Sequence, residues 1–307
     1  MTHSVFIDGA AGTTGLEILE RLALRGEFEL LILDDEQRKS ADARRDAFHA
    51  ADFAVLCLPD QAAAEAVALA QDSKIRIIDA SSAHRVAPGW TYGFPELIGR
   101  EKVAAAARVS NPGCYPTGFL ALLAPLVRFG LLPGDWPYTC HAVSGISGGG
   151  KALIARFAED PDIAYRDYAL AMDHKHGPEM QEYAGLAHAP LFAPAVIPAH
   201  RGMVVEVPLH LSQMARAAPV DGLRDCLTDF YGESAVVKVN AEAPDELLLR
   251  RSMQPTDQLD LWVFGSADGS QARLVARLDN LGKGASGAAV QSLNLMAGLE
   301  ETAGLVL

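Results

Sequence analysis

Cys114 has the setting that most favours covalent chemistry. It lies in the run 110–117, SNPGCYPT, directly before an apolar stretch at 119–127. Pro112 and Gly113 favour a turn, and Pro116 is tolerated in a first helical turn, so we expect the thiol at a helix N-terminus. The positive end of a helix dipole lowers a thiol pKa, and a thiolate is a nucleophile. The pattern therefore predicts attack of this sulfur on an acyl carbon.

Two histidines, His174 and His176, are the candidate proton carriers for such a thiol. A neutral imidazole nearby could take the thiol proton and shuttle a proton during the reaction. Their spacing suits a strand or an extended loop, where the two rings would point to opposite faces. No third ligand follows at an informative spacing, so a metal site is not favoured. Cys57 lies inside an apolar strand, and Cys140 and Cys226 lack flanking turn residues, so these three cysteines are interpreted as structural thiols.

Several later segments could bind an anion. The loop 144–151, SGISGGGK, could cradle one through successive backbone N–H groups with Lys151 adding charge, or could be a flexible linker. Ala152 follows the lysine, which argues against a nucleotide P-loop. Arg201 precedes an alternating strand at 203–211 and could bind a carboxylate or phosphate, or form a surface salt bridge.

Two further predictions concern the helix that follows Cys114 and the last apolar helix of the chain. We expect Pro125 to break or kink the helix that begins at Cys114. The run 279–287, DNLGKGASG, leads into an apolar helix that extends to Met296 and could return to the N-terminal part of the chain. Asn280 and Lys283 could then line a cleft.

The elements that must position these residues begin with alternating strands and helices. Strands are expected at 5–7, 30–33, 54–58 and 76–79, with helices from the first glycine turn to Arg25 and at 61–70. The first turn is 9–15, GAAGTTG, whose glycines Gly9, Gly12 and Gly15 would let the backbone approach a pyrophosphate at a helix N-terminus. Alone it could equally be a tight turn, but strand, glycine turn and helix occur in the order that a dinucleotide site requires. This alternation predicts a parallel, doubly wound sheet.

The segment after the second strand leaves the choice of nicotinamide cofactor open. Asp34 and Asp35 stand where an acidic residue would bind a ribose 2′-hydroxyl and favour NAD. Arg38 and Lys39 follow at once and could pair with a 2′-phosphate instead. Arg44 and Arg45 form a second basic pair, although all these charges could also belong to a solvated loop and helix face.

Composition limits the class of protein. With 307 residues, 50% hydrophobic and 21% charged, the chain can bury one large or two medium cores. The net charge of −13 opposes binding to nucleic acid or anionic membranes, so an anionic ligand needs a local basic patch. The N-terminus lacks a basic signal-peptide region, and no apolar run is long enough to span a bilayer. We therefore expect a cytoplasmic protein with reduced thiols.

Five motifs together resemble the N-acetyl-gamma-glutamyl-phosphate reductase family, in its shorter, type 2 branch. They are the glycine turn 9–15, the run 111–117, the loop 144–151, the segment 174–179 (HKHGPE) and the run 279–284. The resemblance implies NADPH-dependent reduction of N-acetyl-L-glutamyl 5-phosphate to N-acetyl-L-glutamate 5-semialdehyde, with release of phosphate. The reaction would pass through a thioester on the cysteine. The resemblance further implies an architecture similar to that of aspartate-semialdehyde dehydrogenase: a Rossmann-like α/β domain with an inserted α+β catalytic and dimerisation domain.

The resemblance also implies a set of site residues and domain limits. The predicted catalytic residues are Cys114, His176, His174 and Tyr168. The predicted cofactor-binding residues are Gly9, Gly12, Thr13, Thr14, Gly15, Arg38, Lys39, Ser81, Gly148 and Asn280, and the predicted substrate-binding residues are Asn111, Ser144, Lys151 and Arg201. The Rossmann domain is expected at 1–112 with 283–307 and the catalytic domain at 113–282, in a dimer or tetramer.

Three alternative functions remain at this point. Another acyl-phosphate reductase, such as aspartate-semialdehyde dehydrogenase, would use the same thiol, although the HKHGPE segment favours the acetylglutamyl enzyme. A cysteine hydrolase using Cys114 and His176 would not need the glycine turn. A non-catalytic dinucleotide sensor would not need an activated thiol.

Overall fold

The computed structural model describes residues 2–307, which form two compact units. The first unit comprises the chain up to Gly113 together with Ala285–Leu305, and the second comprises Cys114–Gly284 with the last two residues. The chain thus divides after Gly113 and Gly284, against predicted divisions after 112 and 282. Within the described chain, no helix is long and apolar enough to cross a membrane.

The first unit is built on a six-stranded, fully parallel sheet, as predicted from the alternation of strands and helices. Its strand order is β2-β1-β3-β4-β6-β5. The strands are β1 (His3–Asp8), β2 (Phe28–Leu31), β3 (Phe53–Leu56), β4 (Arg76–Asp79), β5 (Thr91–Tyr92) and β6 (Arg108–Ser110). Because β1 lies between β2 and β3, the connections reverse direction there, and the carboxyl ends of β1 and β3 mark the place where such sheets bind ligands.

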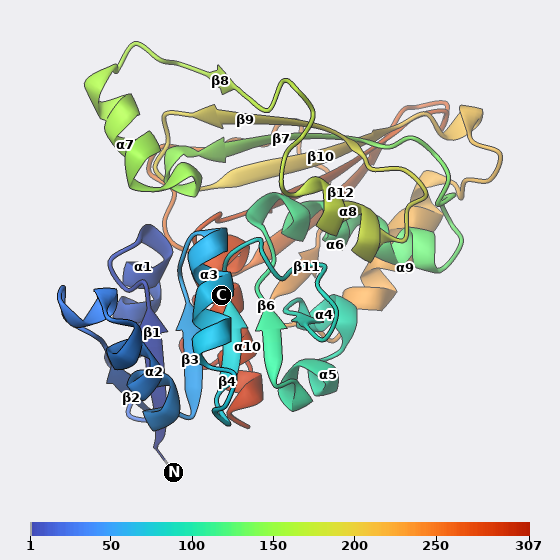
Figure 1. The fold of residues 1–307 in the computed structure, drawn as a ribbon. Coiled ribbons are helices and arrows are strands. Elements are labelled where there is room, and N and C mark those ends of the chain that lie inside the picture. The colour runs from blue at the N-terminus through green and yellow to red at the C-terminus, as the bar shows by residue number, and fades with distance from the viewer. Residues whose placement is uncertain (1) are drawn as a thin grey trace. The chain divides into compact units, whose positions relative to one another are not determined.

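Helices cover both faces of this sheet. They are α1 (Thr13–Leu22), α2 (Ala41–Ala50), α3 (Asp60–Leu69), α4 (Pro95–Ile98), α5 (Arg100–Ala105) and α10 (Gly287–Met296), with a short 3-10 turn η1 (Gln37–Lys39). Side chains of β1 alternate between two cores: Val5 and Ile7 pack with α1 and α10, whereas Phe6 packs with α2 and α3. Figure 1 shows α3 and α10 on opposite faces of the sheet. The apolar helix after residue 287 therefore does return to the N-terminal unit.

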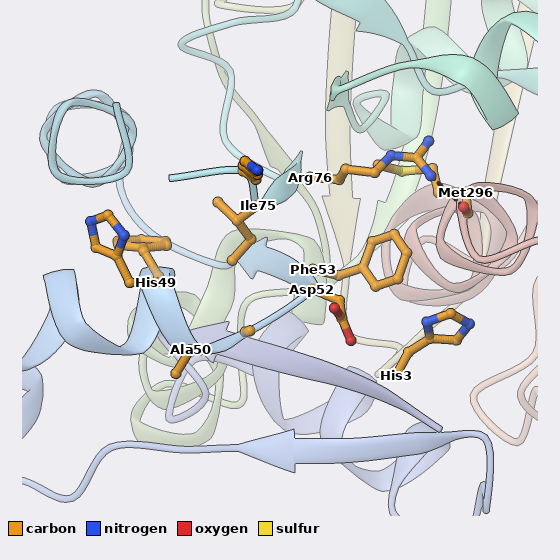
Figure 2. A pocket seen from close by; sticks show the side chains of 11 residues that line it. His3, His49, Ala50, Asp52, Phe53, Ile75, Arg76 and Met296 are labelled. Atoms are coloured by element: carbon orange, nitrogen blue, oxygen red, sulfur yellow. Dashed lines mark hydrogen bonds between the residues drawn. The ribbon is translucent and has the colours of Figure 1, made fainter. Parts of the chain in front are cut away.

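A cavity of about 480 Å³ opens at the amino ends of β1, β3 and β4, opposite the edge that carries the glycine turn (Figure 2). Arg76 lines it, and its guanidinium donates hydrogen bonds to the backbone carbonyls of Ala104, Ala106 and Met296. These carbonyls lie at the C-terminal ends of α5 and α10, where helices leave acceptors unsatisfied. Arg76 therefore joins the end of the C-terminal helix to the central sheet.

The second unit is built on a seven-stranded mixed sheet in the order β11-β12-β13-β10-β7-β9-β8. Figure 1 shows its long strands β7, β9 and β10 side by side. The pairs β7–β9 and β11–β12 are parallel and the others antiparallel. The strands are β7 (Thr139–Gly145), β8 (Arg166–Asp167), β9 (Leu191–Ile197), β10 (Met203–Leu209), β11 (Val237–Val239), β12 (Leu259–Gly265) and β13 (Ala272–Leu278).

Helix α6 (Cys114–Arg128) packs on one face of this sheet. Gly118 allows the close approach, because a Cβ there would lie 2.8 Å from Val205 Cγ2. The other helices are α7 (Gly150–Glu159), α8 (Gly177–Ala184) and α9 (Val220–Tyr231), with 3-10 turns η2 (Ile146–Gly149) and η3 (Leu211–Gln213) and a π-helical turn η4 (Gly282–Ser286). The buried face of β10 presents Met203, Val205 and Val207.

Of the break or kink expected at Pro125, the break does not occur, because α6 runs unbroken to Arg128. Proline lacks the N–H that would donate to the carbonyl four residues earlier, that of Ala121. The hydroxyl of Tyr231, at the end of α9, donates to this carbonyl at 3.0 Å instead. A distant side chain therefore replaces the missing hydrogen bond.

Candidate active site

The glycine turn between β1 and α1 has the conformation that close backbone packing requires. Gly9 has φ +90°, and a Cβ there would lie 2.4 Å from the carbonyl oxygen of Cys57. A Cβ on Gly15 would lie 2.5 Å from the carbonyl oxygen of Gly9. Gly12 is the N-cap of α1 and makes no side-chain cap. The first turn of α1, which includes Thr13, therefore receives no side-chain cap, as a pyrophosphate site requires.

Asp34, one of the two acidic residues that could bind a ribose, is hydrogen-bonded within its own loop. Asp34 Oδ1 accepts hydrogen bonds from the backbone N–H groups of Glu36 and Gln37, at 3.0 and 2.8 Å. Arg38 pairs with the exposed Asp35 at 3.0 Å, and Lys39 is exposed. The loop therefore holds Asp34 in a turn and presents two cations.

The second basic pair is divided between structural roles. Arg44 binds buried Asp8 through Nε and Nη2, at 3.0 and 2.7 Å, and Arg45 pairs with Asp42 at 2.6 Å. Burial raises the pKa of Asp8, and the Arg44 guanidinium opposes that rise. Arg44 thus balances the negative charge of the buried Asp8 carboxylate, which ends the strand before the glycine turn.

The carboxyl ends of β4 and β6 carry a polar network that includes two predicted site residues. Ser81 donates from its N–H and hydroxyl to buried Asp79, at 2.9 and 2.7 Å. His84 Nδ1 lies 2.6 Å from the same carboxylate. Buried Arg85 donates from Nε to the carbonyl of Asn111 at 3.1 Å. Sequence reasoning missed His84 and Arg85, although the polar run after the fourth strand, at the ligand-binding edge, was a usable signal.

In the Asn111 side chain, the amide nitrogen makes a hydrogen bond and the amide oxygen makes none within residues 2–307. Its Nδ2 donates to the carbonyl of Ala285 at 2.9 Å, which fixes the orientation of the amide. Its Oδ1 is buried and meets no donor in residues 2–307. A buried acceptor without a partner costs about 1–3 kcal/mol, so this oxygen is suited to accept an N–H or O–H from a bound ligand.

Cys114 is the first residue of α6, as predicted, and is half-buried. The π-helical turn η4 packs against it: a Cβ on Gly284 would lie 2.8 Å from Cys114 Cβ and 3.1 Å from the carbonyl oxygen of Asp279. The helix N-terminus supplies a positive dipole end to the thiol. The backbone at Gly284 fixes its position.

A cluster of aromatic rings surrounds the residue next to the thiol. The ring centroids of His174 and His176 lie 6.3 and 5.9 Å from that of Tyr115, and Phe192 lies 5.1 Å from it. Tyr168 OH donates to Tyr115 OH at 3.4 Å, and its ring lies 5.6 Å from His174. Burial raises the pKa of Tyr115, and it raises that of Tyr168 to about 12. Both phenols therefore stay protonated at neutral pH, and the structure brings Tyr168 and both histidines to the start of α6.

The expectation that the two histidines point to opposite faces is wrong. Their ring centroids are 4.6 Å apart, because the chain turns into α8 and His176 is its N-cap with helical φ and ψ. The backbone N–H of His176 donates to His174 Nδ1 at 3.1 Å. A ring nitrogen that accepts a hydrogen bond carries no proton, so neutral His174 holds its proton on Nε2.

Three N–H groups near the start of the loop 144–151 are not available to the anion cradle that this loop could form. The N–H groups of Gly145, Ile146 and Ser147 donate to the backbone carbonyls of residues 202, 199 and 200, at 2.9, 2.8 and 3.1 Å. Lys151 lies in the first turn of α7 and is exposed. Ser144 is buried, and a Cβ on Gly148 would lie 3.4 Å from its Oγ. The loop is thus a packed turn that presents Lys151.

Arg201 is attached to the run after β13. Its Nη1 donates to Oδ2 of fully buried Asp279 at 2.9 Å. Asn280 is also buried: its Oδ1 accepts from the N–H of Gly202 at 2.9 Å, and its Nδ2 donates to Ser147 Oγ at 2.8 Å. Lys283 is almost fully buried in η4. Arg201 therefore forms a partly buried ion pair rather than the surface salt bridge considered above.

The other cysteines differ from Cys114 in their environment. Burial raises the pKa of Cys57 to about 12, and it also raises the pKa values of Cys140 and Cys226. Across residues 2–307, no group of three or more His, Cys, Asp or Glu side chains could hold a metal ion.

Comparison with known sequences gives matches along both units. The sequence model of the semialdehyde dehydrogenase NAD binding domain matches residues 4–106, and that of the semialdehyde dehydrogenase dimerisation domain matches residues 114–280. N-acetyl-gamma-glutamyl-phosphate reductase 2 of Nostoc sp. is 46% identical, with 98% of each chain covered. The N-acetyl-gamma-glutamyl-phosphate reductase of Burkholderia cenocepacia is 47% identical, covering 98% of this chain and 99% of the relative.

Solved structures with the same fold have much lower sequence identity. A probable aspartate-semialdehyde dehydrogenase from Pseudomonas aeruginosa has a TM-score of 0.74 at 19% identity, covering 96% of this chain and 98% of that one. Aspartate-semialdehyde dehydrogenase of Candida albicans, determined with NADP, has a TM-score of 0.71 at 14% identity with the same coverage. At these identities the likeness establishes the fold alone.

Proposed function

Because the chain belongs to the N-acetyl-gamma-glutamyl-phosphate reductase family of semialdehyde dehydrogenases, we propose that it reduces N-acetyl-L-glutamyl 5-phosphate to N-acetyl-L-glutamate 5-semialdehyde. The observation that carries the proposal is the place of Cys114 at the start of α6, beside a cluster of two histidines and two tyrosines. Phosphate is the other product, and the reaction is a step of arginine biosynthesis.

Cys114 carries the acyl group in this scheme. Its thiolate attacks C5 of the acyl phosphate, the C–O bond to phosphate breaks, and a thioester forms. Backbone N–H groups at the start of α6 stabilise the oxyanion, and one such donor is typically worth about 2.7–4 kcal/mol of barrier. A bound nicotinamide cofactor supplies the hydride that reduces the thioester. The thiohemiacetal then expels the Cys114 thiolate and leaves the aldehyde.

His176 is the proposed proton carrier. It gives a proton to the oxyanion at C5 and takes it back when the carbon–sulfur bond breaks. Its buried ring beside Tyr115 supports this role. His174 accepts the backbone N–H of His176 and so supports the turn that presents its neighbour. Tyr168, whose hydroxyl meets that of Tyr115, holds the ring cluster together.

The glycine turn fits a dinucleotide. Gly9 and Gly15 have no room for a Cβ, and Gly12 with the N–H groups of Thr13 and Thr14 would bind the pyrophosphate. Ser81, at the carboxyl end of β4, would lie along the same ligand.

NADPH is the proposed form of the cofactor. Asp34 is engaged in its own turn, whereas Arg38 and Lys39 are exposed and carry the positive charge that would pair with a 2′-phosphate. Replacing both basic residues with alanine should raise KM for NADPH at least tenfold and leave KM for NADH within about twofold. An equal rise for both cofactors would contradict this assignment.

The substrate has a phosphate, a carboxylate and an amide to be bound by an acidic chain. Arg201 and Lys151 are the proposed partners of its anionic groups, and buried Ser144 is a further proposed contact. The unpartnered Oδ1 of Asn111 supports a role in accepting an N–H from the substrate.

The direct test uses the reverse reaction. Wild type should reduce NADP in the presence of phosphate and N-acetylglutamate semialdehyde, and Cys114→Ala should lose this activity while binding NADPH normally. Turnover retained by Cys114→Ala would refute the thioester route. Aspartate semialdehyde serves as the comparison substrate, and a preference for it would overturn the substrate assignment.

The second unit supports a proposal of a homo-oligomer. It matches a dimerisation domain, and its sheet carries a cavity of about 510 Å³ whose lining includes Val143, Val204 and Val275, the charged residues Glu206 and Arg273, and the segment 244–247. The three valines lie on the opposite face of the sheet from Val205, which packs on α6. We expect a second copy on this face, so light scattering should give a dimer or tetramer, and Val204→Glu should lower the mass. A monomeric wild type would contradict it.

A further inference from the structure

We propose that Asp279 and Asn280 are positioning residues that together hold Arg201 in place to bind an anionic group of the substrate. This inference rests on the proposed function, because it concerns how the same site binds a phosphate or carboxylate. It gives Asn280 a role different from the cofactor contact expected from sequence resemblance.

The first part of the argument is the burial of Asp279. A fully buried carboxylate is costly unless it is paired and hydrogen-bonded. Its Oδ2 accepts from Arg201 Nη1 at 2.9 Å, and its Oδ1 accepts from the N–H of Leu281 at 2.9 Å. The Arg201 side chain is only 13% exposed. The charge of Asp279 therefore fixes where this guanidinium lies.

Asn280 fixes the backbone on the other side of the same arginine. Its Oδ1 accepts the N–H of Gly202, which must meet an oxygen, so the orientation of the amide is settled. Gly202 has φ +100°, a conformation that favours glycine, and a Cβ there would lie 2.4 Å from Met253 Sδ. Two consecutive residues thus hold the side chain of Arg201 and the peptide that follows it.

The same run also reaches the nucleophile and the glycine-rich loop. Asn280 Nδ2 donates to Ser147 Oγ at 2.8 Å. The N–H of Gly284 donates to the Asp279 carbonyl at 3.0 Å, and this turn sets the Gly284 backbone against Cys114. Arg201, the loop and the thiol are therefore joined through a single short segment of the second unit. An anion held by Arg201 would keep a fixed relation to the sulfur.

The test is a double-mutant cycle on Asp279 and Arg201. Asp279→Asn keeps the shape of the side chain and its acceptor for Leu281 but removes the charge. We expect it to raise KM for the acyl substrate about tenfold, with kcat within about threefold and the Kd for NADPH unchanged, since misplaced binding groups have effects of this order. In an Arg201→Gln background, the same change should have no further effect on KM.

A second readout does not need turnover. Inorganic phosphate should protect Cys114 from iodoacetamide, and Asp279→Asn should raise the half-protecting concentration about tenfold. Ser147→Ala, which removes the partner of Asn280, should shift both readouts in the same direction by a smaller factor, and it serves as the second variant if Asp279→Asn does not fold.

The outcomes separate this inference from the proposed function. An equal effect of Asp279→Asn with and without Arg201, or a lower Tm with unchanged KM and protection, would overturn the positioning role. If wild type is inactive on the acetylated substrate but Asp279→Asn still raises the half-protecting phosphate concentration, the proposed function is overturned and the anion site stands.

Discussion

The contact between Gly284 and Cys114 allows a quantitative test of how the thiol is positioned. A Cβ at residue 284 would lie 2.8 Å from Cys114 Cβ, whereas ordinary contact begins at 3.4 Å. Gly284→Ala must therefore separate the two by 0.6 Å, the difference between those distances. A shift of about 1 Å in a reacting group costs about 10²-fold in rate. Scaling this logarithmically, kcat should fall about 16-fold if Cys114 takes the whole shift and about 4-fold if it takes half.

The assay is steady-state reduction of NADP by the semialdehyde and phosphate, with urea unfolding measured on the same samples. Overpacking at Gly284 should also lower the free energy of unfolding by about 1–3 kcal/mol. Gly26→Ala is the matched control, because nothing lies within 4 Å of its added Cβ. That control should change stability by less than about 0.5 kcal/mol and leave kcat unchanged. A Gly284→Ala enzyme that loses stability but keeps wild-type kcat would refute the idea that this contact positions the sulfur.

The remaining predictions concern stability and reactivity elsewhere in the chain. Arg76→Met should lower the free energy of unfolding by about 3 kcal/mol, because it removes the donors to three helix-end carbonyls; a urea-measured loss below about 1 kcal/mol would contradict this. Iodoacetamide at pH 8 should label Cys114 long before Cys57, because the Cys57 pKa of about 12 leaves that thiol protonated. Equal labelling of the two cysteines, measured by peptide mass spectrometry, would show that burial does not suppress the reactivity of Cys57. Asp268 has its pKa lowered to about 2, chiefly by the Ser266 hydroxyl, so its stabilising effect is present above about pH 4 and is lost as pH falls toward 2. The stability difference between wild type and Asp268→Asn should therefore shrink over that range, and a difference that stays constant in acid unfolding would exclude this cause.

The sequence predicted the first unit well because its signals are local. Apolar runs such as 53–56 are bounded by turn residues, and Gly9 and Gly15 stand where only glycine fits. Each of these features can be recognised within about ten residues. The start of α6 at Cys114 was likewise predictable, since its turn and helix residues are neighbours in the chain.

Two features that local patterns did not reveal depend on partners that are distant in the chain. Pro125 does not break α6 because the Tyr231 hydroxyl replaces the missing donor, and no local pattern announces that contact. The N–H groups at the start of the glycine-rich loop are taken by the carbonyls of residues 199–202. Both contacts join segments that are far apart in the chain, so periodicity and turn residues could not reveal them.

The arginines near the glycine turn show how a chain of net charge −13 can still offer cations to a ligand. Arg38 pairs with Asp35, whose side chain is 89% exposed, and such pairs contribute about 0–1 kcal/mol. Arg38 can therefore exchange this carboxylate for a phosphate at little cost. Arg44 pairs with Asp8, which is only 4% exposed, and breaking a buried pair costs about 3–5 kcal/mol. Arg44 therefore stays with Asp8, and Arg38 with Lys39 is the pair that we propose for a 2′-phosphate.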